Sequence, residues 1–111
     1  MIQPKDVEAA VRWFTGVDPN GKQTYRARHA RRLLYATLRY RSGMGVSEIA
    51  TRFGRASSSV VKTMQLEVVP DEEMDAVWTR AALERDLDEE REQRERANAR
   101  LLARLEEEMA R

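Results

Sequence analysis

The chain has 111 residues and a mass of 12.9 kDa, which allows one small folded body with an extension but not two full hydrophobic cores. It has no cysteine and one histidine, His29, which excludes disulfides, thiolate metal sites and a histidine-based metal cluster. The N-terminus has no apolar run long enough for a signal peptide or a membrane span, and 35% of the residues are charged. We therefore expect a cytoplasmic protein that binds no cofactor, no metal, no membrane and no small-molecule substrate.

The net charge of +1 conceals a separation of charge along the chain. Residues 1–70 hold 12 Lys and Arg against 5 Asp and Glu, whereas residues 71–111 hold 8 against 14. Such asymmetry favours a body that binds a polyanion and carries an acidic extension. A solvated charged surface without any ligand is the alternative interpretation.

The apolar pattern of the first 42 residues predicts two helices. In the first, Val7, Ala10, Val11 and Phe14 recur at helical spacing, and the glycines, proline and asparagine of residues 16–21 predict a loop. The second covers residues 25–42 and is expected to turn an apolar face inward: Ala30, Leu33, Leu34, Thr37 and Leu38. A different face of this helix is expected to be cationic and exposed: Arg28, Arg32, Tyr35 and Arg39.

Residues 45–65, GVSEIATRFGRASSSVVKTMQ, have the pattern of two short helices that cross closely. The first is expected to begin near Ser47, which would cap it, and to end at Gly54. Small Ala50 at the crossing and glycine in the turn suit a helix-turn-helix. The second helix is expected over residues 57–68, with three serines in its first turn that can reach DNA phosphates or base edges. The alternative is that these serines only cap the helix.

The texts YRARHARRLLYATLRYR and SEIATRFGRASSSV resemble the C-terminal DNA-binding domain of the bacterial replication initiator DnaA. That domain is a Trp-repressor-like helix-turn-helix, and the resemblance covers roughly residues 6–66. It implies that Arg28 or His29 enters the minor groove and that Arg55 is the arginine of the turn. It also implies that residues 57–59 stand where the family has the His-Thr-Thr that reads bases and phosphates. No glycine-lysine-hydroxyl phosphate loop is present, so the resemblance does not extend to the family's ATPase domain.

The expected fold is therefore all-α, with a helix-turn-helix body at residues 1–69. The expected function is that of a phage or bacterial protein that binds double-stranded DNA through its major groove and regulates transcription or replication. The residues expected to contact DNA are Arg26, Arg28, His29, Arg31, Arg32, Ser47, Arg52, Arg55, Ser57, Ser58, Ser59, Lys62 and Gln65. If about six cations contact phosphates, log affinity should fall with log salt concentration at a slope of about −5.

Residues 70–111 are expected to form one long charged helix, because Pro70 and three acids suit a helix start and neither Gly nor Pro follows. Its apolar residues either pack on the body or mediate a homodimer. The oligomerisation candidates are Met74, Val77, Trp78, Ala81, Leu101, Leu105 and Met109. A helix that docks on another partner, or one that is merely solvated, is the alternative.

Two other functions fit the same sequence. A phage packaging protein similar to a small terminase subunit also joins a helix-turn-helix to an oligomerising helical part. A protein-interaction module would use the acidic extension to dock on a basic partner. An enzyme is not expected, because the carboxylates are mostly on an exposed charged helix and no histidine is spaced to activate a serine. A DNA-binding protein of this kind would lie on the nucleoid, or in the host cytoplasm if phage-encoded.

Overall fold

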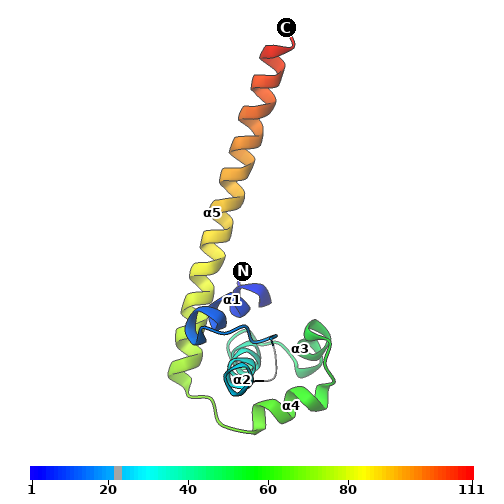
Figure 1. Ribbon diagram of the computed structural model, residues 1–111, viewed down its shortest axis with the longest axis vertical. Helices are drawn as coiled ribbons and strands as arrows, with labels where there is room; N and C mark the ends of the chain where they lie inside the picture. Colours follow the sequence, from blue (N-terminus) through cyan, green and yellow to red (C-terminus); the bar gives the residue numbers. More distant parts are fainter. Residues whose placement is uncertain (22–23) are drawn as a thin grey trace.

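A computed structural model describes residues 1–21 and 24–111 of the chain (Figure 1). Over these residues it contains α-helices and no strand, which confirms the all-helical prediction. The helices are α1 (Pro4–Thr15), α2 (Tyr25–Tyr40), α3 (Val46–Phe53), α4 (Ser57–Gln65) and α5 (Asp71–Met109).

The ends of α1 and α2 follow from local chemistry. Pro4 occupies the first position of α1, where its missing N–H has no helical partner to lose. The Asp6 carboxylate accepts a hydrogen bond from the backbone N–H of Gln3 at 2.7 Å, and Gly16, at φ 75°, ends the helix. The Thr24 hydroxyl caps α2 by accepting from the N–H of Ala27 at 3.1 Å.

The capping expected of Ser47 is wrong. The helix α3 begins one residue earlier, at Val46, with Gly45 as its N-cap. The Glu48 carboxylate accepts a hydrogen bond from the Gly45 N–H at 3.3 Å, which satisfies a donor at the helix start. Ser47 lies in the first turn and is exposed.

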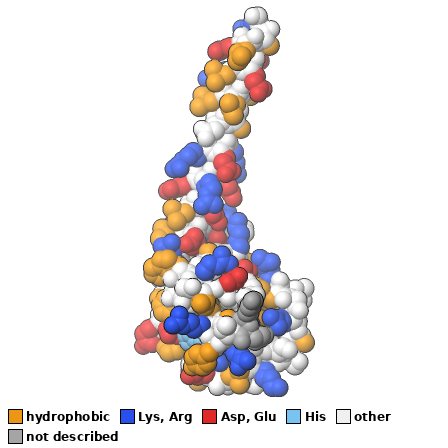
Figure 2. Space-filling model, viewed as in Figure 1, with side chains coloured by type: hydrophobic (Ala, Val, Ile, Leu, Met, Phe, Trp, Pro, Cys, Tyr) orange, Lys and Arg blue, Asp and Glu red, His pale blue; other side chains and the backbone are white. Residues whose placement is uncertain are grey.

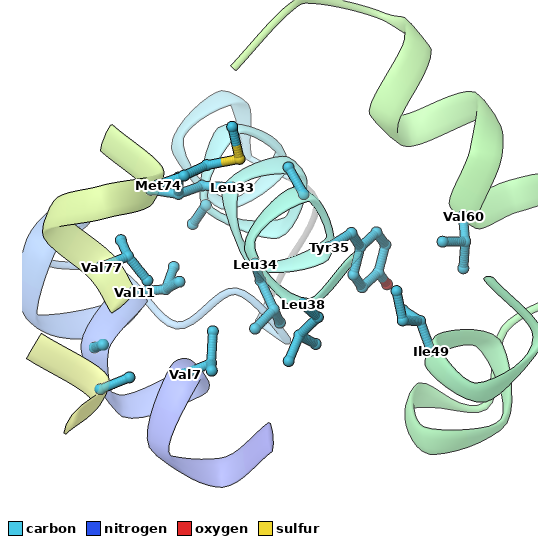
Figure 3. Packing of buried hydrophobic residues seen from close by; sticks show 14 of the residues in the cluster. Val7, Val11, Leu33, Leu34, Tyr35, Leu38, Ile49, Val60, Met74 and Val77 are labelled. Carbon is cyan, nitrogen blue, oxygen red and sulfur yellow. The ribbon is translucent and has the colours of Figure 1, made fainter. Parts of the chain in front are cut away.

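The helix α2 lies at the centre of the core and separates two groups of helices (Figures 1 and 3). Its leucines are fully buried: Leu33, Leu34 and Leu38. On one side α1 and α5 pack against it, contributing side chains that include Val7, Val11, Met74 and Val77 (Figure 3). On the other side α3 and α4 contribute Ile49 and Val60. All these residues form one continuous hydrophobic core.

Two side chains differ from the sequence expectation. Tyr35 is not on an exposed cationic face: only 2% of it is exposed, because α3 and α4 cover that side of α2 (Figure 3). Its ring lies 5.7 Å from that of Phe53. Phe14, which shares the apolar spacing of the first helix, is 39% exposed because it lies in the last turn of α1, beyond the well-buried Val11.

The first turns of the long helix α5 pack along the side of the body, and the rest of the helix extends beyond it (Figure 1). Met74, Val77 and Ala81 are buried against the rest of the chain, and Trp78 packs beside them. Met74, Val77 and Ala81 are therefore not available to a partner, which corrects their assignment as oligomerisation candidates, whereas Trp78 is half-buried. From residue 93 to residue 111 every position is exposed, and the molecule reaches 66 Å in its longest dimension. We call residues 93–111 the free arm.

Ion pairs fasten the start of α5 to α2. The Arg41 guanidinium donates hydrogen bonds to Asp75 at 2.8 Å and to Asp71 at 3.2 Å. These hydrogen bonds raise the pKa of Arg41. The two pairs join the C-terminal end of α2 to the start of α5. Across the described residues, no helix combines the length and the apolar character that a membrane crossing requires.

Candidate nucleic-acid interface

A cavity of about 250 Å³ opens between α2, α4 and the turn that precedes α4. It is lined by Arg28, Arg31, Arg32, Tyr35, Arg55, Ser59, Thr63 and Leu66. Among these described lining residues, four are arginines and none is acidic. The positive charge is thus concentrated where an anion could enter.

The cavity results from helical spacing on α2 and from a tight turn. Residues 28, 32 and 35 are four and three positions apart, which brings them to one side of α2. Gly54, at φ 63°, ends α3 in the left-handed conformation that glycine adopts without strain. The N–H of Arg55 then donates to the carbonyl of Ala50 at 2.9 Å, which ties the turn back onto α3. The side chain of Arg55 reaches the cavity from this turn.

The arginines of the cavity differ in how they are held. Arg32 donates to the carbonyl of Thr63 at 3.2 Å and to the Glu67 carboxylate at 2.6 Å, so its charge is compensated. Arg31 is buried and donates to the carbonyl of Pro19 at 3.1 Å, so it fastens the loop to α2. Its assignment as a solvent-facing DNA contact is corrected accordingly. Over the described residues, Arg28 and Arg55 form no ion pair.

Tyr35 forms the floor of the cavity beside Arg55. Burial raises the pKa of the Tyr35 hydroxyl, and the Arg55 guanidinium acts in the opposite direction by charge and hydrogen bonding. The cavity lining thus places a buried phenol next to an arginine. The Tyr35 hydroxyl and the Arg55 guanidinium are therefore neighbours in the cavity lining.

The three serines at the start of α4 are exposed. The N-cap of α4 is Ala56, and no side chain caps the helix. The hydroxyl groups of Ser57, Ser58 and Ser59 therefore do not serve as its caps, which removes the alternative explanation for them. Ser59 lies on the cavity, and a second, shallower hollow runs along α4 past Ser58, Ser59, Val61, Lys62 and Gln65. Hydroxyls, a lysine and an amide thus follow one exposed face of α4.

Four predicted contacts lie away from these two hollows. Arg26 and His29 line a separate hollow with Phe14, Thr15 and Tyr25. The Nε2 atom of His29 is 3.8 Å from the Glu73 carboxylate of α5, so it faces the opposite group of helices. Arg52 is 3.5 Å from the Glu8 carboxylate of α1. The fourth, Ser47, lies on α3 and lines neither hollow.

The structure thus groups eight of the predicted residues at one place and separates four from them. The grouped residues are Arg28, Arg31, Arg32, Arg55, Ser58, Ser59, Lys62 and Gln65. Ser57 adjoins them at the first position of α4. Figure 2 shows several Lys and Arg side chains over one side of the body, among which acidic side chains are sparse.

The expected DNA contacts left out three residues of the cavity, namely Tyr35, which was placed on the right face of α2, and also Thr63 and Leu66. Thr63 could have been found, because it lies four residues after Ser59 and therefore on the same side of α4. Its hydroxyl donates to the carbonyl of Ser59 at 2.8 Å. Leu66 had no signal, because it follows the last turn of the helix and its position depends on how the chain leaves α4.

Within the described residues, no group of three or more His, Cys, Asp or Glu side chains is arranged to hold a metal ion. Comparison of the chain with protein-family models, with curated proteins and with solved structures found no match.

Proposed function

We propose that this protein binds double-stranded DNA with α3 and α4 as a helix-turn-helix. The first turn of α4 enters the major groove, and a backbone phosphate sits at the cavity between Arg28 and Arg55. One observation carries the proposal. The serines of the first turn of α4 are exposed, do not cap the helix, and lie beside a cavity whose described lining holds arginines and no carboxylate.

The chemistry of this surface suits a duplex. Guanidinium groups bind phosphate through charge-assisted hydrogen bonds, and among the described residues Arg28 and Arg55 have no carboxylate to neutralise them. Serines are short, so the backbone of α4 can approach the base edges closely, and each hydroxyl can donate or accept. Lys62 and Gln65 extend the same face of α4 along the groove. The proposal includes the regulation of transcription or replication in a phage or bacterium, which the resemblance to the initiator domain supports.

The affinity should depend on fewer phosphate contacts than the sequence suggests. Of the cations expected to bind phosphate, Arg31 is buried, and Arg32 and Arg52 are paired with carboxylates. If Arg28, Arg55 and Lys62 provide the contacts, the slope of log affinity against log salt concentration should be about −3.

The serines are tested by selecting bound duplexes from a random pool with the full chain. The selection is repeated after a triple change of Ser57, Ser58 and Ser59 to alanine. We expect the preferred sequence to change or disappear, with little loss of folding stability, because these side chains are exposed and do not cap α4. The control is Ser47→Ala, an exposed first-turn serine of α3 away from both hollows. The same preference after the triple change would contradict a role of α4 in reading bases.

The cavity is tested by a matched pair of arginines two residues apart on α2. Arg28→Ala should weaken binding to every duplex and make the salt slope shallower by about 1. Arg26→Ala removes the same charge from a different hollow and should have a smaller effect. Equal losses for the two variants would mean that the body attracts DNA by overall charge and has no phosphate site at the cavity.

A further inference from the structure

The free arm carries an apolar patch near its end that nothing in the described part of the chain covers. Leu101, Leu102, Leu105 and Met109 are 56%, 60%, 54% and 85% exposed. Figure 2 shows hydrophobic side chains gathered there, above a middle section of α5 where charged side chains predominate. Three leucines and a methionine exposed on one stretch of helix form an apolar patch, and such a patch indicates an interaction surface.

The charges around this patch have a definite order. Arg94, Leu101 and Glu108 are spaced seven residues apart, so they lie nearly in line along one face of α5. Leu102, Leu105 and Met109 are spaced three and four apart beside that line. One face therefore has a cation at its start, apolar side chains at its centre and an anion at its end.

The two end charges have no partner within the described part of their own chain. Both Arg94 and Glu108 are exposed, and within residues 1–21 and 24–111 neither takes part in an ion pair. Nearer the body the same helix satisfies its charges internally, as in the pairs of Arg80 with Glu84 at 2.9 Å and of Arg85 with Glu89 at 3.1 Å. Arg94 and Glu108 are thus available to a second molecule.

We propose that two copies of this chain pair through their free arms in antiparallel orientation, with Leu101 near the two-fold axis. Arg94 of each copy then faces Glu108 of the other, and the leucines of both copies meet between these pairs. The interface is isologous, because one surface supplies both sides. This proposal does not depend on DNA binding.

Charge decides the orientation. A parallel pair in register brings Arg94 against Arg94 and Glu108 against Glu108, so like charges meet at both ends of the patch. An antiparallel pair replaces both repulsions with attractions. Opposite charges facing each other across helices set the direction of pairing in coiled coils in the same way.

The interface is small. The residues from 94 to 109 span about 22 Å of helix at 1.5 Å per residue, and four apolar side chains from each copy supply most of the buried area. The area that this contact buries is therefore smaller than the roughly 1,600 Å² of a standard interface. We therefore expect a weak dimer that forms as protein concentration rises and that salt weakens through its exposed ion pairs.

The test is sedimentation equilibrium of the full chain and of charge-reversed variants. Because each substitution alters two pairs in the dimer, Arg94→Glu or Glu108→Arg alone should weaken association about tenfold. The double variant with both changes should restore association, since the new carboxylate at position 94 of one copy then faces the new guanidinium at position 108 of the other. Controls are Arg100→Glu and Glu107→Arg, which lie on the opposite face of the free arm. A monomer at all concentrations, or a double variant no better than the single variants, would overturn the proposal.

The orientation is tested separately by a distance. The chain has no cysteine, so Thr79→Cys gives a single attachment site for a spin label on an exposed position of α5. An antiparallel pair centred on residue 101 separates the two labels by about 65 Å along the helix axes. A parallel pair would hold them within about 20 Å, because two packed helices lie about 10 Å apart and each label adds its own length. A pulsed electron-spin measurement that found this short distance would overturn the orientation.

Discussion

Tyr35 links the hydrophobic core to the arginine-lined cavity. Its ring packs against Phe53 of α3 with 5.7 Å between ring centres, and its hydroxyl lies at the cavity beside Arg55. The ring therefore contributes to stability, whereas the hydroxyl lies next to a cation of the cavity lining. These two roles can be separated by substitution.

Tyr35→Phe should keep the packing and lose the hydroxyl. We expect the free energy of unfolding to fall by about 1 kcal/mol, and duplex binding to weaken because Arg55 loses a neighbouring polar group. Tyr35→Ala should lower the free energy of unfolding by about 3–5 kcal/mol, because it leaves a cavity between α2 and α3. Urea denaturation followed by circular dichroism measures both. Equal stability losses for the two variants would contradict this division of roles.

Glu8 gives the body a pH dependence. Burial raises the pKa of its carboxyl, and the charges of Arg52 and Arg12 oppose this without cancelling it. The folded state therefore holds this proton to a higher pH than the unfolded state does, so the stabilisation from Glu8 is full at low pH and is lost as pH rises through the folded pKa. Glu8→Gln should gain stability relative to the original chain between about pH 4 and pH 7. Melting temperatures of both chains over that range measure the difference, and a constant difference would contradict the raised pKa.

Helical spacing on the sequence identified the faces of α2 but not what covers them. The spacing of residues 28, 32 and 35 correctly put them on one side, yet only Tyr35 became buried, because α3 and α4 cross that side at its level. Arg31 binds the loop before α2 by donating a hydrogen bond to the carbonyl of Pro19. Such contacts join residues distant in sequence, so local spacing carries no signal for them.

Among the helix ends, those marked by glycine were predictable. Others were not, because α3 begins before Ser47 and α4 ends at Gln65 and not at the expected residue 68. Glycines at positions 16 and 54 end α1 and α3 with positive φ, as glycine after a helical pattern predicts. The first turn of α4 was also predicted, although Ala56 and not a serine occupies the N-cap. The role of α5 was harder to predict, because Met74, Val77 and Ala81 suit either the body or a partner equally well, and only the packing of α1 decides between them.

The position of α5 in the core predicts which truncation the fold tolerates. Removing residues 71–111 would uncover Val7 and Val11 of α1 and would break the ion pairs of Arg41, so this fragment should lose most of its stability. Removing only residues 93–111 takes away exposed positions and should leave the melting temperature of the body nearly unchanged. Thermal unfolding followed by circular dichroism compares the two. Cooperative unfolding of the shorter fragment at an unchanged temperature would show that α5 is dispensable to the core.

At the scale of the whole molecule, the candidate DNA surface and the free arm lie at opposite ends of the long axis (Figure 1). The arm leaves the body from the side of α1, whereas the cavity lies between α2 and α4. The free arm therefore extends away from the surface that would meet phosphate. A second protein molecule on the arm would not obstruct a duplex on the body.

The two proposals together predict that the protein bridges DNA. In an antiparallel pair centred on residue 101, the two copies of residue 84 lie about 50 Å apart along the helix axes. Each body can therefore hold its own duplex. At protein concentrations that populate the dimer, two duplexes with different fluorophores should come together and transfer energy. Arg94→Glu should require about tenfold more protein to reach the same transfer while each body still binds a duplex, and adding Glu108→Arg should restore the transfer. Failure of the original chain to bind a duplex would contradict the DNA proposal. Duplex binding without energy transfer would contradict the antiparallel dimer.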